Sequence, residues 1–220
     1  MAADANNVDS RILGVILAGG QSRRMGGGDK GLLDLGGRSV LAHVIARFAP
    51  QAEKLILNAN GDPQRFAAFN LTIVPDLDER ADGPLAGILA AMHWAKRSGL
   101  GIEAIATVTS DVPFLPHDLI GRLQAASLFG PAIAVSGDRR HPSIALWPMA
   151  LRDQVAGALA REERGLNHFA VRNNAVEVSF AIGEANGAMV DPFFNINAPS
   201  DLAEARAILA RPNVSSPQTQ

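Results

Sequence analysis

The sequence predicts an α/β fold, with one mostly parallel, twisted sheet and helices on both of its faces. Short apolar runs alternate along the chain with segments whose apolar residues recur at helical spacing. The length of 220 residues suits a single domain, and 47% of the residues are hydrophobic, enough for a buried core. No linker rich in Pro, Gly or Ser and no internal repeat divides the chain.

Seven apolar runs are expected to form the strands of this sheet. The first run, from Ile12 to Leu17, is uninterrupted and ends in Ala18-Gly19-Gly20, which is typical of a buried strand that enters a loop. We expect strands at residues 12–17, 54–58, 71–74, 105–108, 131–135, 143–147 and 176–180. We expect helices at residues 40–48, 84–98, 117–128, 150–161 and 199–209.

Composition excludes several classes of protein. The formal net charge of -2 gives no reason to expect a nucleic acid or an acidic membrane surface as a partner. The absence of cysteine excludes disulfides, thiolate catalysis and a cysteine zinc site. No signal peptide is visible, and no apolar run approaches the roughly 20 residues that cross a bilayer. We therefore expect a cytoplasmic enzyme that binds neither nucleic acid nor membrane.

A glycine-rich segment follows the first strand, at the sheet edge where open α/β sheets bind ligands. Residues 17–30 are L-A-G-G-Q-S-R-R-M-G-G-G-D-K. The glycines let backbone N–H groups approach a ligand, and Arg23, Arg24 and Lys30 add positive charge, so the segment suits a polyphosphate. Neither a P-loop nor a dinucleotide-binding fingerprint has this spacing. The alternative is a surface loop whose charges are solvated.

This segment resembles the signature of nucleotidyltransferases with a Rossmann-like fold, such as sugar-nucleotide pyrophosphorylases and cytidylyltransferases. The shared pattern is L-A-G-G-x-S-x-R-M-G-x-x-D-K, and it continues as D-K-G-L-L-D-L at residues 29–35. The continuation is similar to molybdenum cofactor guanylyltransferases, which make the guanine dinucleotide form of that cofactor. The resemblance extends from about Leu13 to Leu202. It implies a Rossmann-like nucleotidyltransferase fold and catalytic roles for Arg24, Lys30 and Asp111.

Asp111 ends a buried strand in the segment V-T-S-D-V-P-F, residues 108–114. A carboxylate there can hold a hard cation such as Mg²⁺, which prefers oxygen ligands. The alternative is an aspartate that caps the turn before Pro113. The resemblance agrees with the first interpretation, because the family places its magnesium aspartate at the matching strand end.

A second candidate for the metal lies near the end of the chain. The segment F-N-I-N-A-P-S-D-L, residues 194–202, resembles the N-x-N-[TA]-P-x-D-L segment of the family. The resemblance implies that Asn197 completes the metal site, with Asn195 as a further candidate. Alternatively, Asn197 caps the helix that begins at Pro199.

The resemblance also implies the nucleotide site. Guanine presents two kinds of N–H donor, so a site that selects it needs carboxylate or carbonyl acceptors. Asp76 and Asp82 are such acceptors, and residues 83–87 (G-P-L-A-G) resemble the base-side loop of the family. For both aspartates the alternative is a solvated loop position. The expected nucleotide-binding residues are Leu17, Ala18, Gly19, Lys30, Asn58, Asp76, Asp82 and Asp111.

The acceptor site is expected in the second half of the chain. His141 begins the segment H-P-S, which resembles an acceptor-side segment of the family. Arg164, with Arg161 and Arg172 nearby in sequence, could bind an anionic acceptor. The alternatives are a loop histidine beside a proline and arginines that face solvent.

These expectations combine into one function. The resemblance implies Mg²⁺-dependent transfer of GMP from GTP to molybdopterin or the molybdenum cofactor. Candidate partners are other cofactor-biosynthesis proteins and the molybdoenzymes that receive the product. Two alternatives remain: a cytidylyltransferase or a sugar- or polyol-phosphate nucleotidyltransferase of the same fold, and a non-catalytic nucleotide-binding module. We expect one domain at about 11–211, divided into nucleotide-binding (11–115) and acceptor-binding (116–211) parts, and disordered tails at about 1–10 and 212–220.

Overall fold

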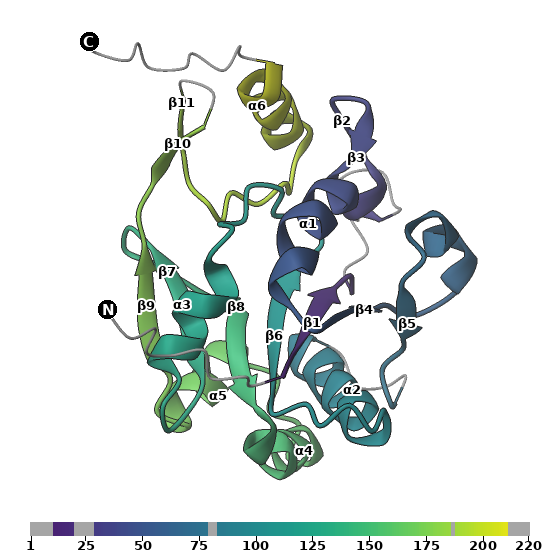
Figure 1. The fold of residues 1–220 in the computed structure, drawn as a ribbon, viewed down its shortest axis with the longest axis vertical. Helices are drawn as coiled ribbons and strands as arrows, with labels where there is room; N and C mark the ends of the chain where they lie inside the picture. The colour runs from purple at the N-terminus through teal and green to yellow at the C-terminus, as the bar shows by residue number, and fades with distance from the viewer. Residues whose placement is uncertain (1–10, 20–28, 79–82, 186–187, 211–220) are drawn as a thin grey trace, which may run out of the picture.

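A seven-stranded sheet runs through the protein in the order β5-β4-β1-β6-β8-β7-β9 (Figure 1). The computed structural model describes residues 11–19, 29–78, 83–185 and 188–210. The expected tails lie outside these residues, as do Arg24 and Asp82. The strands are β1 (Ile12–Leu17), β4 (Lys54–Asn58), β5 (Thr72–Val74), β6 (Ala104–Thr109), β7 (Ala132–Ser136), β8 (Arg139–Pro148) and β9 (Val176–Phe180).

The sheet is mostly parallel, as predicted. β1 pairs in parallel with β4 and β6, β4 with β5, and β7 with β9. Only β8 runs against its neighbours β6 and β7. It follows β7 through a two-residue turn in which Gly137 has φ 53°, and such a short connection requires an antiparallel return.

Helices cover both faces of the sheet (Figure 1). They are α1 (Val40–Phe48), α2 (Pro84–Arg97), α3 (Leu119–Ala126), α4 (Arg152–Ala160), α5 (Leu166–Arg172) and α6 (Pro199–Ala210). Short 3-10 helices and two small hairpins fill the connections. They are η2 (Lys30–Leu32), η3 (Ala49–Gln51), η4 (Pro63–Phe69), η5 (Met149–Leu151), β2 (Asp34–Leu35) with β3 (Arg38–Ser39), and β10 (Gly183–Ala185) with β11 (Ala188–Val190).

Alternation along β1 divides the core between the two faces. Ile12 and Ile16 pack in a cluster with residues of α1 and α3. Leu13, Val15 and Leu17 pack in a second cluster with residues of α2, α4 and α5. Every residue of β1 is therefore buried, which explains the uninterrupted apolar run in the sequence.

The register brings four strand ends to one edge of the sheet. Leu17 lies beside Asn58 on one side and Thr109 on the other, and Asn58 lies beside Val74. The segments after β1, β4, β5 and β6 therefore meet at the edge where such sheets bind ligands. Within the described residues, no helix is long and apolar enough to cross a membrane.

Candidate active site

A cavity of about 170 Å³ lies at this edge of the sheet. It is lined by Leu17, Ala18, Gly19, Asp29, Lys30, Thr109, Ser110 and Asp111. The structure thus brings together five of the predicted nucleotide-binding residues, from two segments far apart in the chain. Backbone hydrogen bonds from Ala18 N to Asn58 O (2.9 Å) and from Ser110 N to Leu17 O (3.2 Å) extend the sheet pairing into the cavity wall.

Among the described residues that line this cavity, Lys30 carries the positive charge. Its Nζ donates a hydrogen bond to Asn197 Oδ1 at 2.6 Å and lies 3.6 Å from Asp111 Oδ2. Lys30 begins η2, which packs closely against the segment after β6. A Cβ on Gly31 would lie 3.2 Å from Ser110 Cβ, so the glycine permits the approach that sets Lys30 beside Asp111.

Asp111 combines burial with an unused oxygen. Burial raises the pKa of its carboxyl group, while hydrogen bonds from the Thr109 hydroxyl and from Lys30, together with the charge of Lys30, act in the opposite direction. The Oδ1 atom of Asp111 is buried and has no hydrogen-bond partner among the described residues, and the same is true of Asn195 Oδ1. Ile196 N donates to Asp111 O at 3.0 Å, so the segment that carries Asn195 is bonded directly to Asp111.

These orphaned oxygens fit a hard cation. Carboxylate and amide oxygens are the atoms that Mg²⁺ prefers, and it is often bound by one or two carboxylates together with substrate phosphates. Across the described residues, no group of three or more His, Asp and Glu side chains is placed to hold a metal on its own. The arrangement therefore suits an ion that arrives with a phosphorylated ligand. Asn197 Oδ1, in contrast, already accepts the hydrogen bond from Lys30.

A second polar cluster lies beyond β4 and β5. Asn58 Nδ2 donates to Asp76 Oδ1 at 2.9 Å and to Val74 O at 3.0 Å. Asn60 Nδ2 donates to Asp76 Oδ2 at 2.7 Å, and Asn60 Oδ1 accepts from Asp76 N at 2.9 Å. Both carboxylate oxygens of Asp76 are thus fixed by amide donors, each with lone-pair capacity left for a ligand.

Asn60 was not among the residues predicted for the site. The sequence N-A-N at residues 58–60 could have indicated it, because Asn60 lies two residues after Asn58, which ends the strand. Its role depends, however, on Asp76 returning beside it after η4, which the sequence pattern does not show.

His141 is an interior residue, with 8% of its surface exposed. Its Nε2 lies 2.8 Å from Ser136 Oγ, and its ring packs 4.9 Å from the ring of Phe193. Burial lowers the pKa of His141; the charge of Asp191 opposes this shift, and that of Arg139 adds to it. The ring is therefore neutral at pH 7 and can offer a ligand a hydrogen bond but no positive charge.

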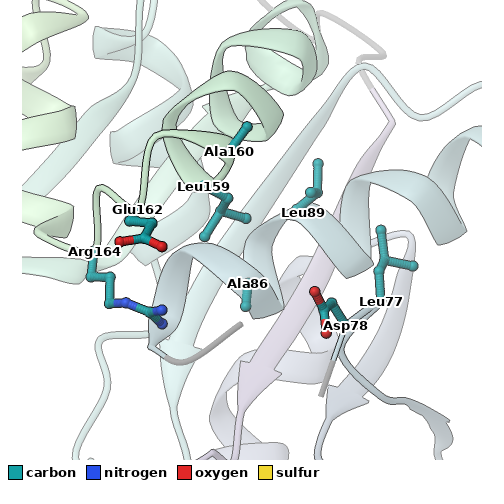
Figure 2. A pocket seen from close by; sticks show the side chains of 8 residues that line it. All are labelled: Leu77, Asp78, Ala86, Leu89, Leu159, Ala160, Glu162 and Arg164. Atoms are coloured by element: carbon teal, nitrogen blue, oxygen red, sulfur yellow. The ribbon is translucent and has the colours of Figure 1, made fainter. Parts of the chain in front are cut away.

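Arg164 lies elsewhere, in a cavity of about 370 Å³ between α2 and α4 (Figure 2). That cavity is also lined by Asp78, Leu89 and Leu159, and both leucines pack on the α2–α4–α5 core. His141 contacts Phe193, which belongs to the core on the other face of the sheet. The structure therefore does not bring the two predicted acceptor residues together.

The two neighbouring arginines are engaged with one glutamate. Arg161 Nε and Arg172 Nη1 lie 3.0 Å and 2.8 Å from Glu163 Oε1. The hydrogen bonds from Arg172 and Arg161 lower the pKa of Glu163 to about 2. Both guanidinium groups are thus engaged by one carboxylate. Arg164 remains the predicted contact for an anionic acceptor.

Known proteins resemble this chain in sequence. The family described as "MobA-like NTP transferase domain" matches residues 14–176. A protein of Mesorhizobium japonicum named molybdenum cofactor guanylyltransferase is 50% identical over 202 residues, which cover 90% of this chain and 96% of that protein. The chain belongs to the molybdenum cofactor guanylyltransferases, within the MobA-like family. The resemblance inferred from residues 17–35 is confirmed, and the chain is a nucleotidyltransferase.

Solved structures share the fold of this chain. A molybdopterin-guanine dinucleotide biosynthesis protein A from Archaeoglobus fulgidus has a TM-score of 0.69 at 22% identity, over 91% of this chain and 100% of that chain. A Mycobacterium tuberculosis protein solved in complex with manganese has a TM-score of 0.62 at 16% identity, over 90% and 98% of the two chains. At these identities both show the fold alone, and they confirm the predicted Rossmann-like nucleotidyltransferase fold.

Proposed function

We propose that this protein transfers GMP from GTP to the terminal phosphate of molybdopterin or the molybdenum cofactor and releases pyrophosphate. The observation that carries the proposal is the cluster of Lys30, Asp111 and Asn197 at the cavity beyond β1 and β6. It joins a fixed cation to a buried carboxylate with an unused oxygen, which is the combination that a triphosphate with its metal requires. The name of the Mesorhizobium japonicum relative supports guanine as the base and the molybdenum cofactor as the acceptor.

In the proposed reaction, an oxygen of the acceptor phosphate attacks the α-phosphorus of GTP, and the bond to the pyrophosphate oxygen breaks. The acceptor phosphate is largely ionised at neutral pH, so no side chain has to remove a proton from it. The work of the protein is to position the two phosphates and to compensate their charge. Lys30 does so from the lining of the cavity, and Arg24 is proposed to do so from the segment outside the described residues.

Mg²⁺ is the proposed cofactor. Asp111 and Asn195 are the residues that would hold it, because their Oδ1 atoms are buried and without partners among the described residues. When bound, the ion would neutralise charge that develops on the phosphate oxygens, an effect worth several kcal/mol. The complex of a protein of this fold with manganese supports a divalent cation in general.

Guanine is proposed to lie on the side of Asn58 and Asp76. The carboxylate of Asp76 is fixed in place and offers acceptors to the N1–H and the exocyclic amine of the base. Asp82, in the segment outside the described residues, is proposed as a further acceptor. A cytosine offers only its amine, so this acceptor-rich side favours guanine over the cytidylyl alternative.

The acceptor is proposed to lie toward the second half of the chain, with His141 and Arg164 as candidate contacts. His141 contacts Phe193 of the core on one face of the sheet, and Arg164 lines a cavity beside the core on the other face. One acceptor molecule would have to extend between the two faces to meet both. The cytoplasm is the proposed compartment, and molybdoenzymes that receive the product are proposed partners.

Release of pyrophosphate with each of the four nucleoside triphosphates, with and without molybdopterin, tests this function. We expect release only when GTP and molybdopterin are both present. Equal or faster release with CTP at saturating acceptor would contradict the guanine assignment and leave nucleotidyl transfer standing. Release without molybdopterin would contradict the proposed acceptor.

A further inference from the structure

Arg65 contacts both parts of the proposed nucleotide site, the phosphate cavity and the polar cluster around Asp76. It lies on η4, between β4 and β5, and its guanidinium makes two contacts with separate parts of the chain. Arg65 Nε lies 2.9 Å from Asp29 Oδ2, and Arg65 Nη2 donates a hydrogen bond to Asn60 O at 2.5 Å. The guanidinium also stacks 4.8 Å from the ring centre of Phe66, which is fully buried. Arg65 is therefore held by packing and not only by charge.

The first contact changes the charge of the phosphate cavity. Asp29 lines that cavity next to Lys30, so an unpaired carboxylate there would repel a triphosphate and compete with it for Lys30. The ion pair with Arg65 is partly shielded, since the two side chains are 32% and 21% exposed. Arg65 thus compensates Asp29 and leaves the charge of Lys30 available to the ligand.

The second contact fixes the turn that holds Asp76. Asn60 donates one hydrogen bond to the Asp76 carboxylate and accepts one from Asp76 N, and Arg65 donates to the backbone carbonyl of the same Asn60. Gly61 follows with φ 80°, and a Cβ there would lie 3.1 Å from Arg65 Nη1. A left-handed glycine therefore gives the guanidinium the room to reach this carbonyl.

We propose that Arg65 is a positioning residue for the nucleoside triphosphate: it neutralises Asp29 beside the phosphates and fixes the Asn60 turn beside the base. The inference rests on the proposed function, in which GTP spans these two parts. It adds a residue on η4 that the glycine-rich motif does not contain.

Equilibrium binding of GTP to Arg65→Ala tests the inference. We expect Kd and the KM for GTP to rise about tenfold while kcat changes little. The decisive variant is Arg65→Ala combined with Asp29→Asn, because removal of the uncompensated carboxylate should restore most of the lost affinity. A purely structural role for Arg65 predicts no such restoration. Arg65→Lys, which keeps the charge but not the paired geometry, should fall between the wild type and Arg65→Ala.

Arg122→Ala is a matched control. Arg122 also donates to a backbone carbonyl, stacks on a phenylalanine and lies 3.8 Å from a carboxylate, but its partners Ser179, Phe180 and Asp118 do not line the phosphate cavity. Its GTP affinity should equal that of the wild type. Unchanged GTP binding in Arg65→Ala, or a double variant no better than Arg65→Ala, would overturn the inference.

Failure of the proposed function would look different. If the wild type bound another nucleoside triphosphate and not GTP, the guanylyl assignment would fail. The same variants would then be measured with the nucleotide that binds, because compensation of Asp29 matters for any triphosphate.

Discussion

Gly87 of α2 lies directly against the side chain of Asn58, at the end of β4. A Cβ at position 87 would come within 2.2 Å of Asn58 Oδ1 and within 3.0 Å of Leu17 Cδ2. No side chain larger than hydrogen fits there unless Asn58 moves. Since Asn58 donates to Asp76, the small residue on α2 fixes the position of an acceptor proposed to bind the base.

Gly87→Ala should therefore weaken GTP binding. We expect the Kd for GTP to rise about tenfold as Asn58 is displaced, and the free energy of unfolding to fall by about 1–3 kcal/mol from overpacking. Gly121→Ala is the matched control, because Gly121 is also helical but a Cβ there meets nothing within 4 Å. It should raise the free energy of unfolding by about 0.5–1 kcal/mol and leave GTP binding unchanged. Equal effects of the two substitutions on GTP binding would contradict the role of Gly87.

Asp111→Asn should remove activity and stabilise the fold. The pKa of Asp111 is raised from 3.8 by burial, so at pH 7 its ionised carboxylate costs folding free energy that an amide does not. We expect turnover to be lost, with partial recovery at high Mg²⁺, and the free energy of unfolding to rise by about 1 kcal/mol. This gain should disappear as the pH falls below 3.8, where the carboxyl group is protonated in both states.

Chemical denaturation of the metal-free protein at pH 7 measures this gain. Asp118→Asn is the control, since the Asp118 side chain is 65% exposed and lies 3.8 Å from Arg122 in a long ion pair. If Asp111→Asn lost stability, or kept full activity at ordinary Mg²⁺, the role of Asp111 would be to cap the turn before Pro113 and not to bind the metal.

The main strands were predictable because burial on both faces leaves a signal in the sequence. The runs at 12–17 and 54–58 match β1 and β4 in full. The run at 143–147 matches only part of β8, which begins at Arg139 with polar residues that an apolar run cannot reveal. Helix α5 (Leu166–Arg172) was not predicted, because seven residues with three buried positions are too short for a helical period to stand out.

The candidate site was predictable where a motif carries it. Lys30 and Asp111 were expected together, and they lie 3.6 Å apart. Arg65 was not expected, because its importance arises from η4, which brings it to Asp29 from a later part of the chain. The position of Arg164 beside α2 depends on how α4 packs against the sheet, and the local sequence does not determine that packing.

Stability between pH 7 and pH 5 should depend on His141. Because burial lowers its pKa in the folded state, the unfolded chain takes up a proton first, and stability should fall as the pH drops through 6.5. Of the charged groups that act on it, Asp191 reduces the effect and Arg139 increases it. Gln at position 141 can keep a hydrogen bond to Ser136 but does not titrate. The unfolding free energy of His141→Gln should therefore change less between pH 7 and pH 5 than that of the wild type, with a difference of up to about 1 kcal/mol.

Denaturation curves at pH 5, 6 and 7 provide the measurement. His168→Gln, which removes an exposed histidine, is measured beside His141→Gln as the control substitution. The contribution of Glu163, with a pKa of about 2 in the folded state, is lost only at more acidic pH and does not enter this range. If the unfolding free energies of wild type and His141→Gln changed by the same amount between pH 7 and pH 5, His141 would not be the source of the pH dependence.

The last prediction separates the roles of Asn195 and Asn197. Asn197 Oδ1 accepts a hydrogen bond from Lys30, and the backbone N–H groups of Asn197 and Ala198 both donate to Asp201 Oδ2, at 2.7 Å and 2.9 Å. Asn197 is thus bound from both sides by protein groups. Asn195 Oδ1 is buried and without a partner among the described residues, so it is the amide oxygen left for a cation.

We therefore expect Asn195→Ala to change the Mg²⁺ dependence of the activity and Asn197→Ala to change the KM for GTP. Asn195→Ala should raise the Mg²⁺ concentration for half-maximal activity about tenfold and leave the KM for GTP at saturating Mg²⁺ nearly unchanged. Asn197→Ala should free Lys30 from its fixed position, raise the KM for GTP and leave the Mg²⁺ dependence close to that of the wild type. Titrations of Mg²⁺ and GTP against both variants measure the two quantities independently. The opposite pattern would make Asn197 the metal ligand, and the bond between Lys30 and Asn197 would then have to break when the metal binds.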